Sequence, residues 1–149
     1  MEKFLAAVHI VLAVFAIGPL VHGASTAARG IRQRDAAAIA ASTRMVTIYG
    51  YLSVLVAVVG MSLVQPKPAF HDRHFSDTWI WLALVLWIVA TVLVFALLLP
   101  GLKAAAAALG PDAPADRLTS LTGRVAAAGG LIALIYLVIV VLMVYKPGA

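Results

Sequence analysis

Residues 19–50 read PLVHGASTAARGIRQRDAAAIAASTRMVTIYG, and the landmarks of this stretch recur about eighty residues later. The four matched pairs, at separations of 81, 81, 80 and 80 residues, are Pro19 and Pro100, Asp35 and Asp116, Arg44 and Arg124, and Gly50 and Gly130. A gap of a single residue keeps both copies in step. The pattern therefore predicts two tandem copies of one helical hairpin.

The composition around this stretch is that of a membrane protein. Of 149 residues, 64% are hydrophobic and 11% are charged, and the mean hydropathy of +1.06 lies outside the soluble range. The stretches that carry no Asp, Glu, Lys or Arg are 4–28, 45–65, 78–102 and 125–145. Each reaches the roughly 20 residues needed to cross a hydrocarbon core about 30 Å thick, where a helix satisfies its own peptide groups. The sequence predicts an all-α polytopic protein with four transmembrane helices in a bundle.

The chain 1–149 is interpreted as a single membrane domain built from two hairpins. The first is predicted over 1–68, with spans at 4–28 and 36–65, and the second over 78–147, with spans at 78–102 and 116–146. Because each copy crosses the membrane twice, we expect a pseudo-two-fold axis along the membrane normal. Asp35 and Asp116 precede the second helix of each hairpin, where an Asp can accept backbone N–H bonds. We expect both of these helices to be about thirty residues long.

Lys and Arg are unevenly divided between the two sides of the predicted bundle. Connections 29–44 and 103–124 hold seven of them, and the opposite side holds four. The positive-inside rule places both connections in the cytoplasm and both termini outside. The net charge of +5 lies beside the spans, which favours contact with anionic membrane lipids rather than nucleic acid. Arg44 and Arg124 are expected to reach lipid phosphates, or alternatively to hold an anionic ligand.

His9 is an ionisable residue inside the first span, on a helix face it shares with Ala6, Ala13 and Ala16. Small residues mark close helix contacts in membranes, so we expect His9 to face the bundle. Two interpretations stay open: a neutral imidazole hydrogen-bonded across helices, or a ligand for a cofactor such as haem. His22 follows thirteen residues later, about 140° around the helix, which disfavours two stacked haems. His9 and His22 are the candidate cofactor-binding residues, and the cofactor is not identified.

The predicted outer connection contains a second group of histidines. His71 and His74 stand three residues apart, with Asp72 between them. Such a group can bind zinc or copper if the loop turns back on itself. The alternative is a polar loop at the membrane surface.

Small residues form one face of the second span and part of the fourth. The residues assigned to helix packing are Gly50, Ser53, Ala57, Gly60 and Gly130. Pro19 and Pro100 lie near the inner ends of the first and third spans, where each removes a backbone hydrogen bond and is expected to bend its helix.

Single residues along the whole chain support a family resemblance. Ile17-Gly18-Pro19, Arg44, Tyr49-Gly50 and the span 81–100 resemble DUF2269, a family of bacterial predicted integral membrane proteins with four spans and no assigned function. The histidine of the opening span is more distantly similar to that of the CopD-type copper-resistance and HemJ-type haem-biosynthesis membrane families. The further intramembrane histidines and charges of those families have no counterpart here.

The sequence contains no catalytic constellation and no cysteine, which removes thiolate and iron–sulfur chemistry. We expect a non-enzymatic structural or accessory protein that acts through helix–helix association, as a homodimer or as a subunit of a larger membrane complex. One alternative is a haem- or quinone-associated redox protein that uses His9. Another is a small transporter or a metal-handling protein.

Overall fold

The computed structural model describes residues 2–64, 77–110 and 114–147, and within these ranges the regular structure is helical. The helices are α1 (Glu2–Arg32), α2 (Ala36–Ser62), α3 (Thr78–Leu93), the π-helical turn η1 (Val94–Leu98), α4 (Leu99–Ala107) and α5 (Ala115–Tyr145). The segments α3, η1 and α4 form one continuous helix. The described residues thus contain four helices long and apolar enough to cross a membrane, which confirms the predicted fold class.

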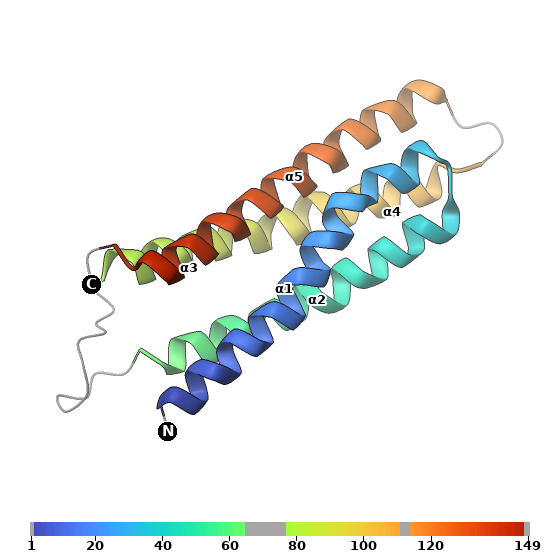
Figure 1. Ribbon diagram of the computed structural model, residues 1–149. Helices are drawn as coiled ribbons and strands as arrows, with labels where there is room; N and C mark the ends of the chain where they lie inside the picture. Colours follow the sequence, from blue (N-terminus) through green and yellow to red (C-terminus); the bar gives the residue numbers. More distant parts are fainter. Residues whose placement is uncertain (1, 65–76, 111–113, 148–149) are drawn as a thin grey trace.

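The helices run alternately up and down (Figure 1). The α1–α2 turn, the end of α4 and the start of α5 lie at one end of the bundle, called here the turn end. The start of α1 and the end of α5 lie at the other, called here the terminal end. Helix α1 packs against α2 and α5, and α3 packs against α5. Helix α1 therefore packs on α5 as well as on its neighbour α2, and the division into two repeated hairpins with a pseudo-two-fold relation stays a prediction.

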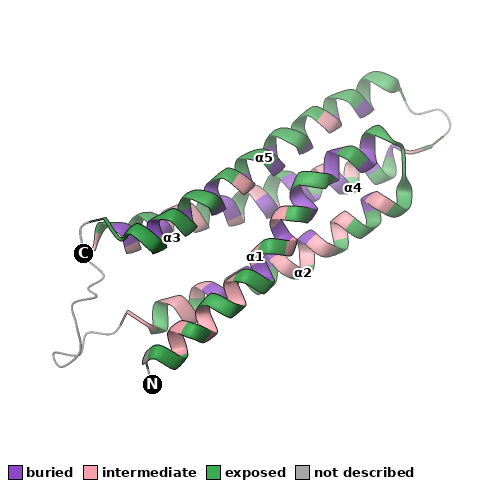
Figure 2. Cartoon of the chain, in the orientation of Figure 1, coloured by how far each residue is buried: buried purple, intermediate pink, exposed green. Residues whose placement is uncertain are grey.

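The best-packed part of the core lies in the half of the bundle nearer the turn end. Its fully buried members are Leu20, Ala27, Ile39, Val46, Leu98, Leu102, Ala105 and Ile132. Every buried residue of α1 lies at or beyond Ala16, whereas Phe4, Ile10 and Phe15 are exposed (Figure 2). In a bilayer such side chains meet lipid tails, so their exposure carries no hydrophobic cost.

The turn between α1 and α2 follows from its residues. The Asp35 N–H donates to the Gly30 oxygen and the Arg34 N–H donates to the Ile31 oxygen, both at 3.0 Å, which closes a Schellman motif. Arg34 takes the left-handed position with φ 50°. The Asp35 carboxylate then accepts the Ala38 N–H at 3.0 Å and begins α2, as predicted.

The second hairpin begins its long helix differently. Asp116 lies inside the first turn of α5, where Pro114 occupies the N-cap position and no side chain caps the helix. The cap predicted for Asp116 is therefore wrong. Its carboxylate acts only through its charge, which favours the positive end of the helix dipole. The predicted lengths agree, since α2 has 27 residues and α5 has 31.

The two prolines also differ. Pro19 lies inside the continuous helix α1. Pro100 follows the π-helical turn, in which the Leu99 N–H donates to the Val94 oxygen five residues earlier. A proline ring collides with the carbonyl four residues before it, and widening the preceding turn relieves this contact. The matched prolines of the sequence thus produce two unlike local structures.

Candidate functional site

His9 lies on α1 and forms a hydrogen bond to α2. Its Nδ1 is 3.1 Å from the backbone oxygen of Val56. Because a carbonyl oxygen can only accept a hydrogen bond, Nδ1 carries the proton and donates it. In a neutral imidazole the other ring nitrogen, Nε2, then holds a lone pair. The bond to Val56 therefore sets the tautomer of His9 as well as its position.

Gly60 provides the space in which the His9 ring lies. A Cβ atom at residue 60 would stand 2.7 Å from Cε1 of His9 and 3.2 Å from Nδ1. Real Cβ atoms do not approach other atoms so closely, so any other residue would push the ring away from Val56. The small residue assigned to helix packing at this position accommodates a histidine.

The second nitrogen of His9 is available to a ligand. Within the described part of the chain, Nε2 has no hydrogen-bond partner, and it is not among the polar atoms sealed inside the fold. The whole side chain is half-buried. A histidine whose Nδ1–H is anchored on a backbone carbonyl presents Nε2 as a fixed acceptor or metal ligand.

A half-open groove runs between α1 and α2, nearer the turn end than the His9 ring, and neither His9 nor Val56 lines it. It encloses about 160 Å³ and is lined by Leu12, Phe15, Ala16, Tyr49, Leu52 and Leu55. Leu12 lies one helical turn after His9, and Leu55 precedes Val56 in the chain. Sequence reasoning missed this groove because its lining is apolar, like the spans around it. The one sequence feature that pointed toward this region was the helix face shared by His9 and Ala16.

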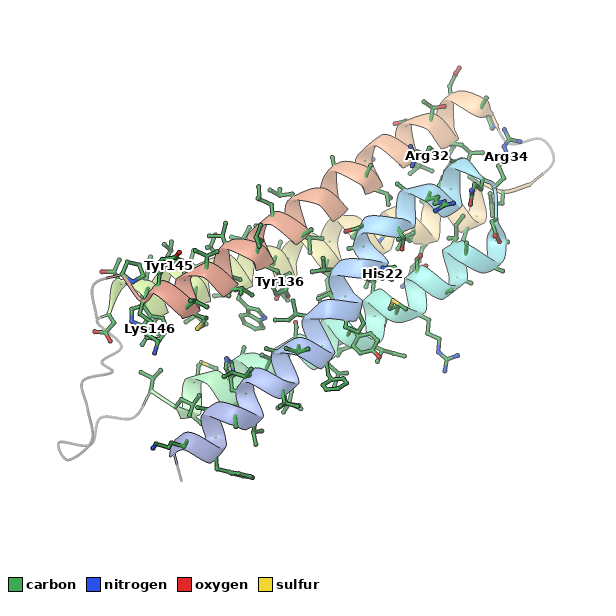
Figure 3. The ribbon with its side chains drawn as sticks, viewed as in Figure 1. His22, Arg32, Arg34, Tyr136, Tyr145 and Lys146 are labelled. Atoms are coloured by element: carbon green, nitrogen blue, oxygen red, sulfur yellow. The ribbon has the colours of Figure 1, made fainter. Side chains whose placement is uncertain are left out.

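Two buried hydroxyl groups face each other between the hairpins. Ser53 of α2 has 2% of its surface exposed, and its Oγ donates to the Gly50 oxygen at 2.7 Å. Tyr136 of α5 (Figure 3) is also 2% exposed, and its hydroxyl lies near the Ser53 side chain. The Tyr136 hydroxyl has no hydrogen-bond partner among the described residues. Tyr136 was not singled out from the sequence, because nothing in its apolar span distinguishes it.

The other packing residues of α2 have distinct surroundings. A Cβ atom at Gly50 would lie 3.3 Å from the Phe95 ring of the π-helical turn. That ring also meets Tyr51, with 5.0 Å between the ring centres. Ala57 is only partly buried. Gly50 thus lets the widened turn of the second hairpin approach the first.

Gly130 does not pack inside the molecule. It is exposed, and a Cβ atom there would meet nothing within 4 Å. The close contact is made by the neighbouring Gly129, which lies against the backbone of Ala24 in α1. Gly130 thus makes no packing contact among the described residues, because adjacent residues point about 100° apart around a helix, and the helix-packing role assigned to it stays a prediction.

The remaining candidate ligands do not form a site in the described residues. His22 is exposed and stands apart from His9 along α1, and its backbone oxygen accepts a hydrogen bond from Thr26. His71, Asp72 and His74 lie outside the residues that the structure describes. Within residues 2–64, 77–110 and 114–147, no three His, Cys, Asp or Glu side chains gather in a way that would hold a metal ion.

Basic side chains surround the turn end. Arg32 and Arg34 lie beside the α1–α2 turn (Figure 3), and Arg44 and Arg124 are exposed on α2 and α5. At the terminal end, the Lys146 ammonium lies 6.0 Å from the centre of the Trp79 ring, a cation–π contact. Each end of the bundle therefore presents cations.

The comparisons with known proteins identify a family. A family model described as "Predicted integral membrane protein (DUF2269)" matches residues 3–147. Neither the curated proteins nor the solved structures contain a match to this chain.

Proposed function

The chain belongs to the DUF2269 family of predicted integral membrane proteins, and from this premise we propose that it acts by helix–helix association rather than as an enzyme. Its partner is a second copy of the same chain, which makes a homodimer in the bacterial inner membrane. Packing on a larger membrane complex is the alternative form of the same function.

The observation that supports association is an open stripe of small residues on α5, formed by Gly123, Ala127 and Gly130. All three are exposed, and a Cβ atom on Gly123 or Gly130 would meet nothing within 4 Å. Their spacing of four and three residues places them on one helix face. Small residues let two helix backbones approach closely, and such contacts drive association in lipid, where hydrophobic burial contributes nothing.

The distribution of charge supports an orientation for this dimer. Seven of the eleven Lys and Arg residues belong to the connections 29–44 and 103–124. We place the turn end in the cytoplasm and both termini outside. Arg44 and Arg124 then reach the phosphates of anionic lipids through their flexible stems.

Two glycine variants test the association. Gly130→Leu fills the open stripe without entering the fold, because nothing lies near its Cβ position. Gly18→Leu is the matched control, since Gly18 is also exposed and open but lies on α1. In a mild detergent, light scattering on the eluted protein should show dimers for the wild type and for Gly18→Leu, and monomers for Gly130→Leu. A wild-type monomer with no co-purifying protein contradicts the proposal.

A second candidate function is supported by His9. Its Nδ1–H donates to Val56, and its Nε2 remains available as a ligand. This arrangement suits a redox group in the membrane, such as haem or a quinone. An absorption spectrum tests the haem form, and the absence of a Soret band before and after haemin is added removes it. The transporter or metal-handling alternative depends on His71 and His74, outside the described residues, and stays a prediction.

A further inference from the structure

We propose that two helix pairs form arms that open and close at the terminal end of the bundle, about a hinge near its middle, and that a hydrogen bond from Tyr136 to Ser53 holds the closed state. The first arm consists of 2–18 and 51–62, and the second of 77–93 and 131–145. The inference goes beyond the functions proposed above, because it uses neither the open stripe of α5 nor Nε2 of His9.

Each arm is packed internally far from the hinge. In the first, His9 of α1 is hydrogen-bonded to Val56 of α2. In the second, α3 packs on α5 and the Lys146 ammonium lies near the Trp79 ring. Among the described residues the arms make no comparable contact with each other, since every buried residue of α1 lies at or beyond Ala16 and α3 packs on α5 rather than on α1 or α2. Figure 1 shows the start of α1 well apart from the end of α5.

The hinge is a level at which three of the four spans are weakened. Gly23 of α1 lies against Val46 of α2. Four residues nearer the terminal end on each helix, Pro19 is therefore at the level of Gly50. Gly50 in turn lies against the π-helical turn η1 of the third span. A proline removes a backbone hydrogen bond, a π-helical turn interrupts the regular ladder, and a glycine places no side chain between the helices, so bending is easiest at this level.

Unpaired polar atoms lie on the terminal side of the hinge. Within the described residues, the buried side-chain polar atoms that have no hydrogen-bond partner belong to Asp77, Trp79, Trp87 and Tyr136. All four residues are in the second arm. An unpaired donor in a membrane has no water to satisfy it, so it favours a movement that gives it a partner. The open arrangement of the arms therefore leaves polar groups that closure can pair.

Tyr136 and Ser53 are the pair that closure brings together. The Ser53 hydroxyl already donates its hydrogen to the Gly50 oxygen at 2.7 Å, so its oxygen can only accept a further bond. The Tyr136 hydroxyl lies near it, on the other arm, and has a hydrogen to donate. Ser53 is one helical turn from Gly50, whereas the end of α2 is about four times as far away. A shift of about 1 Å at the hydroxyls thus becomes about 4 Å at the arm ends.

The test measures distances between pairs of spin labels by pulsed electron paramagnetic resonance, on the full chain in bilayer discs. The chain has no cysteine, so introduced pairs are labelled specifically. The pair across the arms is Phe4→Cys with Val144→Cys, and the control within the first arm is Phe4→Cys with Met61→Cys; all three positions are exposed. An excess of unlabelled chain ensures that only distances within one chain are recorded, even in a dimer.

The pair across the arms should give two populations whose distances differ by about 4 Å, whereas the control pair should give one. A single distance across the arms, as narrow as that of the control, overturns the hinge. Pro19→Ala restores the N–H that the Phe15 oxygen lacks in the helix and should reduce the two populations to one. Two unchanged populations in Pro19→Ala would also contradict the hinge.

A tyrosine variant tests the hydrogen bond that holds the closed state. Tyr136→Phe keeps the ring and removes the hydroxyl, so the population with the shorter distance should fall about fivefold, the value of one hydrogen bond of about 1 kcal/mol. Tyr51→Phe is the matched control, because Tyr51 is exposed on α2 and its ring contact with Phe95 is retained. Equal populations in Tyr136→Phe and Tyr51→Phe would show that no bond between Tyr136 and Ser53 holds the arms together.

Discussion

Gly129 of α5 lies directly against the backbone carbonyl of Ala24 in α1, with no side chain between the two helices. This is where the first hairpin and the last helix approach most closely among the glycine positions. Ala24 is 1% exposed, and Ala128, which precedes Gly129 in α5, is buried as well. The register between the two hairpins is therefore set by a contact that only glycine permits.

The first prediction concerns this crossing. Gly129→Ala should lower the free energy of unfolding by about 1–3 kcal/mol, because its methyl group meets backbone, which cannot move aside as a side chain can. Gly130→Ala is the control: it adds the same methyl group one residue later, into open space. Unfolding in mixed micelles with increasing dodecyl sulfate measures both. Equal stability of the two variants would contradict the crossing.

The second prediction concerns the α1–α2 turn. Arg34 has φ 50°, a left-handed conformation that costs a residue with a Cβ about 1 kcal/mol relative to glycine. Arg34→Gly should therefore stabilise the protein by up to about 1 kcal/mol. Arg32→Gly removes the same charge at the last residue of α1 and should destabilise by a similar amount. Thermal melting of the two variants should move in opposite directions.

A third prediction follows from the position of His9 over Gly60. Gly60→Ala should displace the ring and break its bond to Val56, at a cost of about 1–2 kcal/mol. In a His9→Ala background the same change should be almost neutral, because the ring is gone. The double-mutant cycle then gives a coupling energy of about 1 kcal/mol or more. Additive effects of the two substitutions would mean that the residues do not touch.

The fourth prediction concerns Tyr136, whose buried hydroxyl has no partner in the described residues. Tyr136→Phe removes a group that would be costly to leave unpaired in hydrocarbon, so stability should stay equal or rise by about 1 kcal/mol. Tyr136→Ala removes the ring as well and should cost about 3–5 kcal/mol. If Tyr136→Phe instead lowers stability, the hydroxyl is hydrogen-bonded in the membrane, and Ser53 is the neighbour to test by substitution.

Much of the fold could be predicted because its cause is local. Charge-free length decides where a helix can cross the bilayer, and Asp35 begins α2 through its own side chain. The end of α1 was less predictable: the helix continues to Arg32, beyond the apolar stretch 4–28, because a Schellman motif ends it rather than a change of polarity. Such motifs depend on the conformation of one residue, here an arginine where glycine is usual.

The candidate site was predictable only in its parts. His9 and Gly60 were both singled out, but residue spacing along one helix says nothing about the register between two helices. That register is set by contacts such as Gly23 against Met45 of α2. The contact of Gly129 with α1 could not be predicted for the same reason, since only the path of α1 decides which glycine of α5 it meets. Nothing in the sequence marks Tyr136 as a candidate, because its pairing with Ser53 appears only when α2 and α5 are placed side by side.

The last prediction concerns orientation, which depends on seven cations against four. Each Lys or Arg beside the cytoplasmic leaflet gains about 1 kcal/mol from anionic lipids, so a difference of three favours the turn end inside. The chain has no cysteine, so a single introduced cysteine reports its own location. Pro147→Cys at the terminal end should react in intact cells with a maleimide that cannot cross membranes, whereas Gly110→Cys beyond α4 should react only after the cells are opened. Both positions are exposed, so accessibility is matched.

The reverse pattern would place the basic connections outside and remove the proposed contact of Arg44 and Arg124 with cytoplasmic anionic lipids.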